Sequence, residues 1–249
     1  MPDVEIQWDQ PPSQWPLQGK DIHVWAVALD VLPAQLSAFE ATLSPDEQNR
    51  AHRFYFERDR NHFIAGRGTL RAILGSYLKI EPRQLQFEYG SRGKPVLANL
   101  PGHRPLHFNL AHSAGLMLVA VSRECLVGVD VERIRSTGDA EDLVERFFSP
   151  AEAVQLRALP GHQRTQAFFN LWTRKEACLK ATGDGISERL HQIAVSFLPD
   201  EPARILQPLE PRQLARAWTL QELDPAREYA AAIAAATDSL NLSCWRWAH

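Results

Sequence analysis

The stretch Ser44–Glu47 (Ser-Pro-Asp-Glu) recurs 105 residues later as Ser149–Glu152 (Ser-Pro-Ala-Glu). In each copy a serine at the N-cap, a proline at the first helical position and a glutamate at the third form a capping box, which predicts the start of a helix. The same shift superposes three further pairs of identical residues: Phe63 on Phe168, Ala72 on Ala177, and Leu74 on Leu179. A shift shared by a helix start and the helix after it indicates an internal duplication.

The duplication predicts the fold class. We expect an α+β protein, a pseudo-dimer of two similar halves, each a small and mainly antiparallel sheet packed with a long helix. Residues 1–20 carry several prolines and no clear periodicity, which is typical of an extended arm. Residues 21–110 then form the first half and residues 111–249 the second. Because ligands often bind in clefts between packed units, we expect the active site between the halves.

Hydrophobic patterns place the main elements. Helical periodicity predicts one long helix from about Asp59 to Leu78 and a second helix that includes residues 171–180. Apolar runs rich in β-forming residues predict strands at 23–29, 106–110, 116–121, 126–132 and, at the end of the chain, 242–247.

The composition narrows the class of protein. The chain has 249 residues, 45% hydrophobic and 23% charged, with a net charge of −3, which is ordinary for a soluble globular protein. There is no bulk basic character that would indicate nucleic-acid binding. Three cysteines without a C-x-x-C spacing, and an N-terminus without the pattern of a signal peptide, predict a cytoplasmic protein with no membrane partner. Since a duplication removes one need for dimerisation, we expect a monomer.

The segment Gly128–Glu132 (Gly-Val-Asp-Val-Glu) is the first candidate site. Side chains alternate along a strand, so Asp130 and Glu132 share one face, about 6.6 Å apart. Two neighbouring carboxylates repel each other unless a cation lies between them. Mg²⁺ takes oxygen ligands and commonly binds one or two carboxylates together with substrate phosphates. A solvent-facing acidic edge is the alternative interpretation of the same pattern.

The helix over residues 171–180 carries the second candidate group. Lys175 falls among apolar neighbours on the helical wheel, with Glu176 and Lys180 at the borders of that arc. An ordinary Glu176–Lys180 pair at i,i+4 explains two of the three charges and leaves Lys175 unexplained. An anionic ligand with a metal ion accounts for all three. Residues 50–71 add six arginines, which indicate either a phosphate or acidic-protein surface or a solvated helix face.

Six short motifs, taken in order, resemble those of the 4′-phosphopantetheinyl transferases of the surfactin-synthetase-activating (Sfp) type. Each motif is weak alone, but their order and spacing over about residues 44–186 make the resemblance specific. The motifs are Arg50-x-x-Arg53-Phe54, Gly93-Lys94-Pro95, Phe108-Asn109-x-x-His112-Ser113, Gly128-x-Asp130-x-Glu132, Arg146-Phe147-Phe148-Ser149 and Trp172-x-x-Lys175-Glu176-x-x-x-Lys180.

The resemblance implies a reaction and a metal. Coenzyme A would donate its phosphopantetheine arm to a serine of an apo acyl or peptidyl carrier protein, and adenosine 3′,5′-bisphosphate would leave. Asp130, Glu132 and Glu176 are implied to hold Mg²⁺, with Mn²⁺ as a second option, on the pyrophosphate. Glu176 is implied to be the general base, and Lys180 the catalytic cation that offsets charge on the phosphates.

The resemblance also implies which residues hold coenzyme A. Two positions depart from the family pattern, because Glu47 stands where relatives can carry a basic residue and Ala111 stands where serine is common. Binding of the 3′-phosphate is therefore expected to rest on Arg50 and its neighbours. The full set expected to bind coenzyme A is Arg50, Arg53, Arg92, Gly93, Lys94, Pro95, His112, Ser113, Asp130, Lys175 and Lys180.

Two other functions remain open at this point. One is a Mg²⁺-dependent pyrophosphohydrolase of coenzyme A-like nucleotides, which would use water in place of the carrier serine. The other is a non-catalytic protein that binds coenzyme A or the carrier, for which the retained acids would have no purpose. The carrier's pathway is also open, since fatty-acid, polyketide, peptide and lysine-type carriers all fit the sequence.

Overall fold

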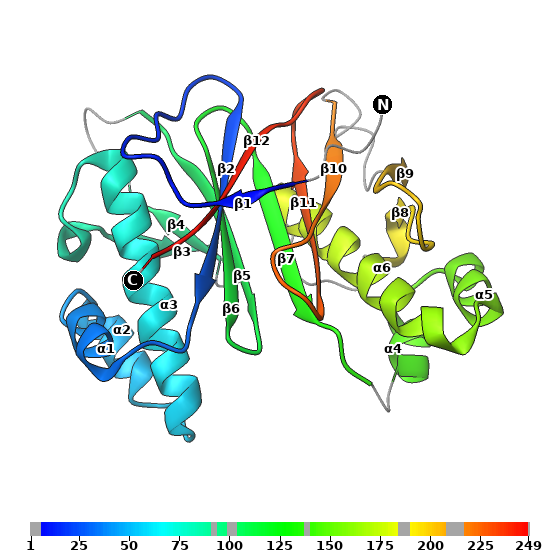
Figure 1. The fold of residues 1–249 in the computed structure, drawn as a ribbon, viewed down its shortest axis with the longest axis horizontal. Coiled ribbons are helices and arrows are strands. Elements are labelled where there is room, and N and C mark those ends of the chain that lie inside the picture. The colour runs from blue at the N-terminus through cyan, green and yellow to red at the C-terminus, as the bar shows by residue number, and fades with distance from the viewer. Residues whose placement is uncertain are drawn as a thin grey trace.

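The computed structural model describes residues 6–90, 94–98, 104–136, 140–183, 190–207 and 217–248. Figure 1 shows two halves side by side, with the strands in the middle and the helices α1–α3 and α4–α6 on opposite outer sides. Within the described residues, every helix is too short or too polar to span a membrane.

The first half is built on the antiparallel strands β2 (Asp21–Ala28), β6 (Leu116–Ser122) and β5 (His107–Ser113), with β6 in the centre. Between β2 and β5 the chain forms three helices, α1 (Pro33–Glu40), α2 (Pro45–Ala51) and α3 (Glu57–Leu78). A short 3₁₀ turn, η1 (Pro82–Gln84), and the hairpin of β3 (Phe87–Tyr89) and β4 (Pro95–Leu97) follow α3.

The second half repeats this order. The strands β7 (Val127–Arg133), β11 (Tyr229–Ala235) and β10 (Thr219–Leu223) form an antiparallel sheet with β11 in the centre. Its helices are α4 (Ala140–Phe147), α5 (Pro150–Ala158) and α6 (Gly161–Thr182). They are followed by η2 (Leu190–Gln192) and by the pair β8 (Ala194–Val195) and β9 (Ile205–Gln207). The match of element for element confirms the predicted pseudo-dimeric α+β fold.

An apolar core between the two sheets joins the halves. It contains Leu118 of β6, Val129 and Val131 of β7, and Ile233 of β11. Separate cores pack α3 on the outer face of the first sheet and α6 on the outer face of the second. The layers therefore run helix, sheet, sheet, helix across the molecule (Figure 1). Asn109 of β5 ties the sheets together, because its Oδ1 accepts a hydrogen bond of 2.9 Å from the backbone N–H of Val129.

The capping boxes form as predicted, but the register of the long helices differs from the prediction. Glu47 and Glu152 accept hydrogen bonds from the backbone N–H of Ser44 and Ser149. Helices α3 and α6 each have 22 residues and end at a left-handed residue, Lys79 or Gly183. These helices lie 104 residues apart, because the distance from the N-cap serine of the short helix to the start of the long helix is one residue shorter in the second half. The predicted superposition inside the helices was therefore wrong by one residue.

The strand pairing also corrects the predicted boundaries. A division after residue 110 would cut β5, which pairs with β6 in the first sheet, so the second half begins at β7. The predicted last strand is present as β12 (Asn241–Arg246), but it pairs in parallel with β2 and so belongs to the first sheet. Of the N-terminal arm, β1 (Trp8–Asp9) pairs with β12, and the ring of Trp15 packs on Trp25 and Tyr77.

Candidate active site

Gly128 allows α6 to approach β7 closely enough to build the site. Val129 and Val131 point into the core between the sheets, so the alternate positions 128, 130 and 132 face α6. A Cβ atom at Gly128 would lie 2.1 Å from the carbonyl oxygen of Ala177 and 2.3 Å from the backbone nitrogen of Ala181. Only glycine permits this contact, and the contact brings the α6 residues just before those two positions beside Asp130.

Glu176 and Lys180 are those residues, and with Asp130 they form a buried charged cluster. The Nζ of Lys180 donates to Oδ1 of Asp130 at 2.6 Å. Asp130 and Glu176 are buried, with only 4% and 1% of their surface exposed. Among the described residues, Oδ2 of Asp130 and both carboxylate oxygens of Glu176 have no hydrogen-bond partner. Buried oxygens without partners are costly, and a bound cation would satisfy them.

Burial raises the pKa values of all three acids of the cluster. Burial raises the pKa of Glu176 to about 7, the charges of Asp130 and Glu132 add to this rise, and Lys180 opposes it. Burial also raises the pKa of Asp130, against the effect of Lys180. The pKa of Glu132 is raised by burial too, although the hydroxyl of Ser113 donates to its Oε2 at 2.7 Å.

The donor set fits a hard divalent cation in chemistry. Carboxylate oxygens on β7 and α6 are the ligands that Mg²⁺ and Mn²⁺ accept. Within the described residues, however, no three His, Cys, Asp or Glu side chains stand ready at metal-binding spacing. Lys180 already neutralises one oxygen of Asp130, so the side chains must rearrange before they can surround an ion.

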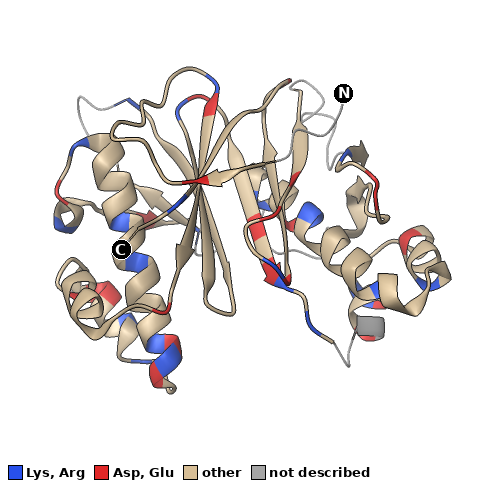
Figure 2. Ribbon diagram, in the orientation of Figure 1, with Lys and Arg blue, Asp and Glu red and all other residues tan. Residues whose placement is uncertain are grey.

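Basic side chains from the first half approach this cluster. His112 lies at the end of β5, and its pKa is lowered by loss of hydration and then by the charges of Lys180, His62 and Arg50. Those groups come from α6, α3 and α2, so both halves contribute to one positive region. Figure 2 shows Lys and Arg along α3 and acidic residues on β7. The arrangement suits a ligand with several negative charges.

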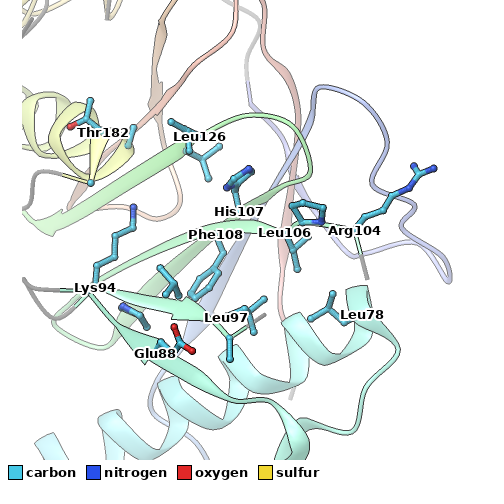
Figure 3. Close-up of a pocket in the computed structure, with 18 residues that line it drawn as sticks. Leu78, Glu88, Lys94, Leu97, Arg104, Leu106, His107, Phe108, Leu126 and Thr182 are labelled. Atoms are coloured by element: carbon cyan, nitrogen blue, oxygen red, sulfur yellow. The ribbon is translucent and has the colours of Figure 1, made fainter. Parts of the chain in front are cut away.

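Lys94 connects the hairpin of the first half to α6. Its Nζ donates to the backbone carbonyl of Lys180 at 2.7 Å, and its pKa is lowered by burial and by the charge of Lys180. Lys94 and Pro95 also line a cavity of about 720 Å³ between the β3–β4 hairpin, the start of β5 and the end of α6 (Figure 3). Arg92 and Gly93, the other predicted residues of this loop, lie outside the described residues.

Comparison with known protein sequences identifies the family of this chain. Residues 126–234 match the family described as the 4′-phosphopantetheinyl transferase superfamily, and residues 30–124 match 4′-phosphopantetheinyl transferase, N-terminal. Over 98% of this chain and 100% of the relative, the sequence is 45% identical to the 4′-phosphopantetheinyl transferase HetI of a Nostoc species. The chain belongs to the 4′-phosphopantetheinyl transferase superfamily.

More distant transferases are also similar. The 4′-phosphopantetheinyl transferase psf-1 of Bacillus pumilus is 33% identical over 70% of this chain and 72% of the relative. Sfp of Bacillus subtilis is 27% identical over 68% of this chain and 73% of the relative. Among solved structures, a Chronobacterium ammoniagenes ACPS–CoA complex covers 45% of this chain and 95% of its own, at 26% identity and a TM-score of 0.33. The match of the two family models to the two halves agrees with a division between residues 124 and 126.

Lys175, one of the residues expected to bind coenzyme A in this transferase, is buried in an ion pair. Lys175 has no exposed surface, and its Nζ donates to Oε2 of Glu152 at 2.6 Å and to the carbonyl of Leu190 at 2.9 Å. The Nζ also lies 5.3 Å from the centre of the Phe148 ring. Lys175 therefore faces α5 and η2 instead of the carboxylate cluster.

The other predicted residues of the transferase are placed as follows. Arg50 is exposed at the end of α2, with its guanidinium 5.3 Å from the centre of the Phe63 ring. Arg53 is exposed just beyond α2, and its contact with coenzyme A stays a prediction. Ser113 is engaged by Glu132 and accepts from the backbone N–H of Arg133.

Two residues that the sequence analysis did not single out also shape the site. His62 of α3 lies near His112 and bonds Oδ1 of Asp30 at 2.7 Å through its Nε2. Asn109 links the sheets, and its place beside His112 in one motif was the available signal. For His62 the sequence carried no signal beyond its position among the arginines of residues 50–71.

Proposed function

We propose that this protein transfers the 4′-phosphopantetheine arm of coenzyme A to a serine of an apo acyl or peptidyl carrier protein and releases adenosine 3′,5′-bisphosphate. The observation that carries the proposal is the buried Glu176 beside Asp130 and Lys180, with both its carboxylate oxygens unpaired among the described residues, in a member of this transferase superfamily. Membership of the superfamily gives the class of reaction, and the cluster supplies side chains that could carry it out.

Glu176 is the proposed general base. The carrier serine oxygen forms a bond to the phosphorus that bears the pantetheine, and the bond from that phosphorus to the bridging oxygen of the pyrophosphate breaks. Glu176 takes the serine proton, directly or through one water. Burial raises the pKa of Glu176 to about 7, and a cation bound beside it would keep more of the carboxylate in the ionised form that accepts a proton. The departing bisphosphate carries the electron pair of the broken bond.

Positive groups on both halves are the proposed phosphate ligands. Lys180 is proposed to offset charge on the transferred and leaving oxygens, since charge stabilisation supplies most of the catalysis in phosphoryl transfer. His112, Arg50 and Lys94 are proposed to hold the pyrophosphate and the 3′-phosphate. The charge of Lys180 lowers the pKa values of His112 and Lys94, and the charge of Arg50 lowers the pKa of His112, which supports these roles.

Asp130, Glu132 and Glu176 are the residues proposed to hold Mg²⁺, with Mn²⁺ as a replacement. Bound there, the ion would neutralise pyrophosphate charge and polarise the reacting phosphorus. Buried oxygens of Asp130 and Glu176 have no partner in the part of the chain that the structure describes, which supports this assignment because a cation would satisfy them. We further propose a cytoplasmic monomer without nucleic-acid or membrane partners, since one chain supplies both halves of the site.

Incubation with coenzyme A, Mg²⁺ and a panel of apo carrier proteins, followed by intact-mass measurement, tests the reaction. Transfer makes a carrier heavier by about 340 Da, the mass of the arm. Release of adenosine 3′,5′-bisphosphate should match the modified carrier in amount. Consumption of coenzyme A in samples without a carrier would instead identify a pyrophosphohydrolase, and binding without consumption would identify a non-catalytic protein.

A further inference from the structure

Each half of the molecule contains a buried ion pair between its long helix and its capping-box glutamate, and in the first half Arg67 of α3 also pairs with that glutamate. In the second half, Lys175 of α6 pairs with Glu152, the capping-box residue of α5, and bonds the carbonyl of Leu190 in η2. In the first half, Arg71 of α3 pairs with Glu47, the capping-box residue of α2. Arg71 also donates to the carbonyls of Pro82 and Leu85 at the two ends of η1, both at 2.9 Å.

The two arrangements correspond in position as well as in chemistry. Arg71 and Lys175 are 104 residues apart, which is the spacing of the two long helices. Each cation is almost fully buried, with 1% and 0% of its surface exposed. Each joins three consecutive elements: the short helix, the long helix and the 3₁₀ turn. Each half therefore contains one clamp, a buried cation that joins the short helix, the long helix and the 3₁₀ turn. The cation is Arg71 in the first half and Lys175 in the second.

Only the clamp of the second half lies next to a reacting group. Lys175 precedes Glu176, so the clamp fixes α6 from the side opposite to its contact with Gly128 on β7. The equivalent neighbour of Arg71 in the first half is Ala72, which has no ionisable group. Glu176 has no hydrogen bond of its own within the described residues, so only the helix backbone and its packing hold its carboxylate in place.

We propose that Lys175 and Glu152 act as a positioning pair that holds Glu176 at the reacting centre, and that Lys175 does not bind coenzyme A. This inference rests on the proposed function. Lys175 acts on Glu176 only through the backbone of α6. The position of that backbone must be accurate, because a displacement of the base by about 1 Å can cost about a hundredfold in rate. The pair is a fixed part of α6 and its neighbours, not a group that reaches the phosphates.

A double variant, Lys175→Met with Glu152→Gln, removes the pair without leaving one buried charge alone. Gln at position 152 can still accept from the N–H of Ser149, which preserves the capping box. We expect a folded protein with kcat lowered about tenfold to a hundredfold and the KM for coenzyme A changed by less than about threefold. The single variant Lys175→Arg keeps a cation at this position. Its kcat should stay within about threefold of wild type, because Arg71 makes the same set of contacts in the first half.

The control removes a different ion pair from the same helix, in which the arginine is buried and the glutamate is half exposed. Arg174 pairs with Glu222 of β10 and bonds the carbonyl of Ser196. Arg174→Met with Glu222→Gln should keep kcat within about threefold of wild type. Thermal melts of all variants show which remain folded at the assay temperature.

Three results would overturn the proposal. A folded Lys175/Glu152 double variant with wild-type kcat would show that the pair has no effect on the reaction. A rise in the KM for coenzyme A at unchanged kcat would return Lys175 to the ligand. An equal loss of kcat in the Arg174 control would show that the effect is general to α6.

If the double variant does not fold, a folded Lys175→Arg variant with kcat lowered more than about tenfold overturns the proposal instead. Failure of wild type to modify any carrier is a separate result, which refutes the proposed function itself.

Discussion

Gly128 gives the sharpest structural prediction. Replacing it by alanine adds one carbon atom at 2.1 Å from the carbonyl oxygen of Ala177 and 2.3 Å from the backbone nitrogen of Ala181. Both atoms belong to the backbone of α6, so no side-chain rotation can relieve the overlap. Helix α6 must therefore move away from β7 by about 1 Å, since close-packed interiors do not tolerate such contacts.

The displacement sets the size of two effects. Overpacking of this kind costs about 1–3 kcal/mol in the free energy of unfolding. For a chain of this length, that lowers Tm by about 2–12 °C. The same movement carries Glu176 and Lys180 away from Asp130, and a misplacement of about 1 Å is expected to lower kcat about a hundredfold. The loss of rate should therefore exceed what the loss of stability explains at the assay temperature.

Calorimetry and carrier-transfer kinetics of Gly128→Ala measure both effects. Gly161→Ala is the matched control, because it lies at the first residue of the same helix and a Cβ there meets no atom within 4 Å. The control should keep wild-type kcat, with equal or slightly higher stability. A Gly128→Ala variant with wild-type Tm and wild-type kcat would refute the close approach of α6 to β7 as the basis of the site.

Further predictions concern pH and metal. Because burial raises the pKa of Glu176 from 4.5 to about 7, its ionised form destabilises the metal-free fold by up to about 3 kcal/mol above pH 7. Urea unfolding in EDTA at pH 8 should show Glu176→Gln to be more stable than wild type, with the difference gone below pH 4.5. Burial lowers the pKa of His23 to about 4, so wild type should lose stability as pH falls from 6.5 towards 4, and thermal melts of His23→Gln should lose this sensitivity; an unchanged acid transition would contradict it. EDTA should abolish transfer and Mn²⁺ should restore it. Full activity in EDTA would exclude the proposed role of Asp130, Glu132 and Glu176 as metal ligands.

Much of the fold follows from local sequence signals. The capping boxes at Ser44 and Ser149 are complete in four residues, so their repetition predicts two equivalent helices and hence two halves. The strands were visible as apolar runs. The pairing of β12 with β2 was not, because hydrophobicity identifies a strand without identifying its neighbour. The one-residue difference between helix spacing and cap spacing was hidden by chance identities such as Phe63 and Phe168.

The site was predictable to the extent that one element carries it. Strand alternation placed Asp130 and Glu132 on one face, and helical spacing placed Glu176 one turn before Lys180. The ion pair of Lys175 was not predictable, because a charge on an apolar arc indicates a partner without showing which one. The partner, Glu152, lies on another helix, and only the packing of α5 on α6 brings it within 2.6 Å.

The central claim is that Glu176 accepts the serine proton during transfer of phosphopantetheine from coenzyme A. Single-turnover transfer to an apo carrier, measured for wild type and Glu176→Gln alongside calorimetric titration of coenzyme A, tests this claim most directly. We predict that the variant binds coenzyme A within about tenfold of wild type, while its transfer rate falls by a factor of about a hundred or more. Transfer by Glu176→Gln at the wild-type rate would contradict the account.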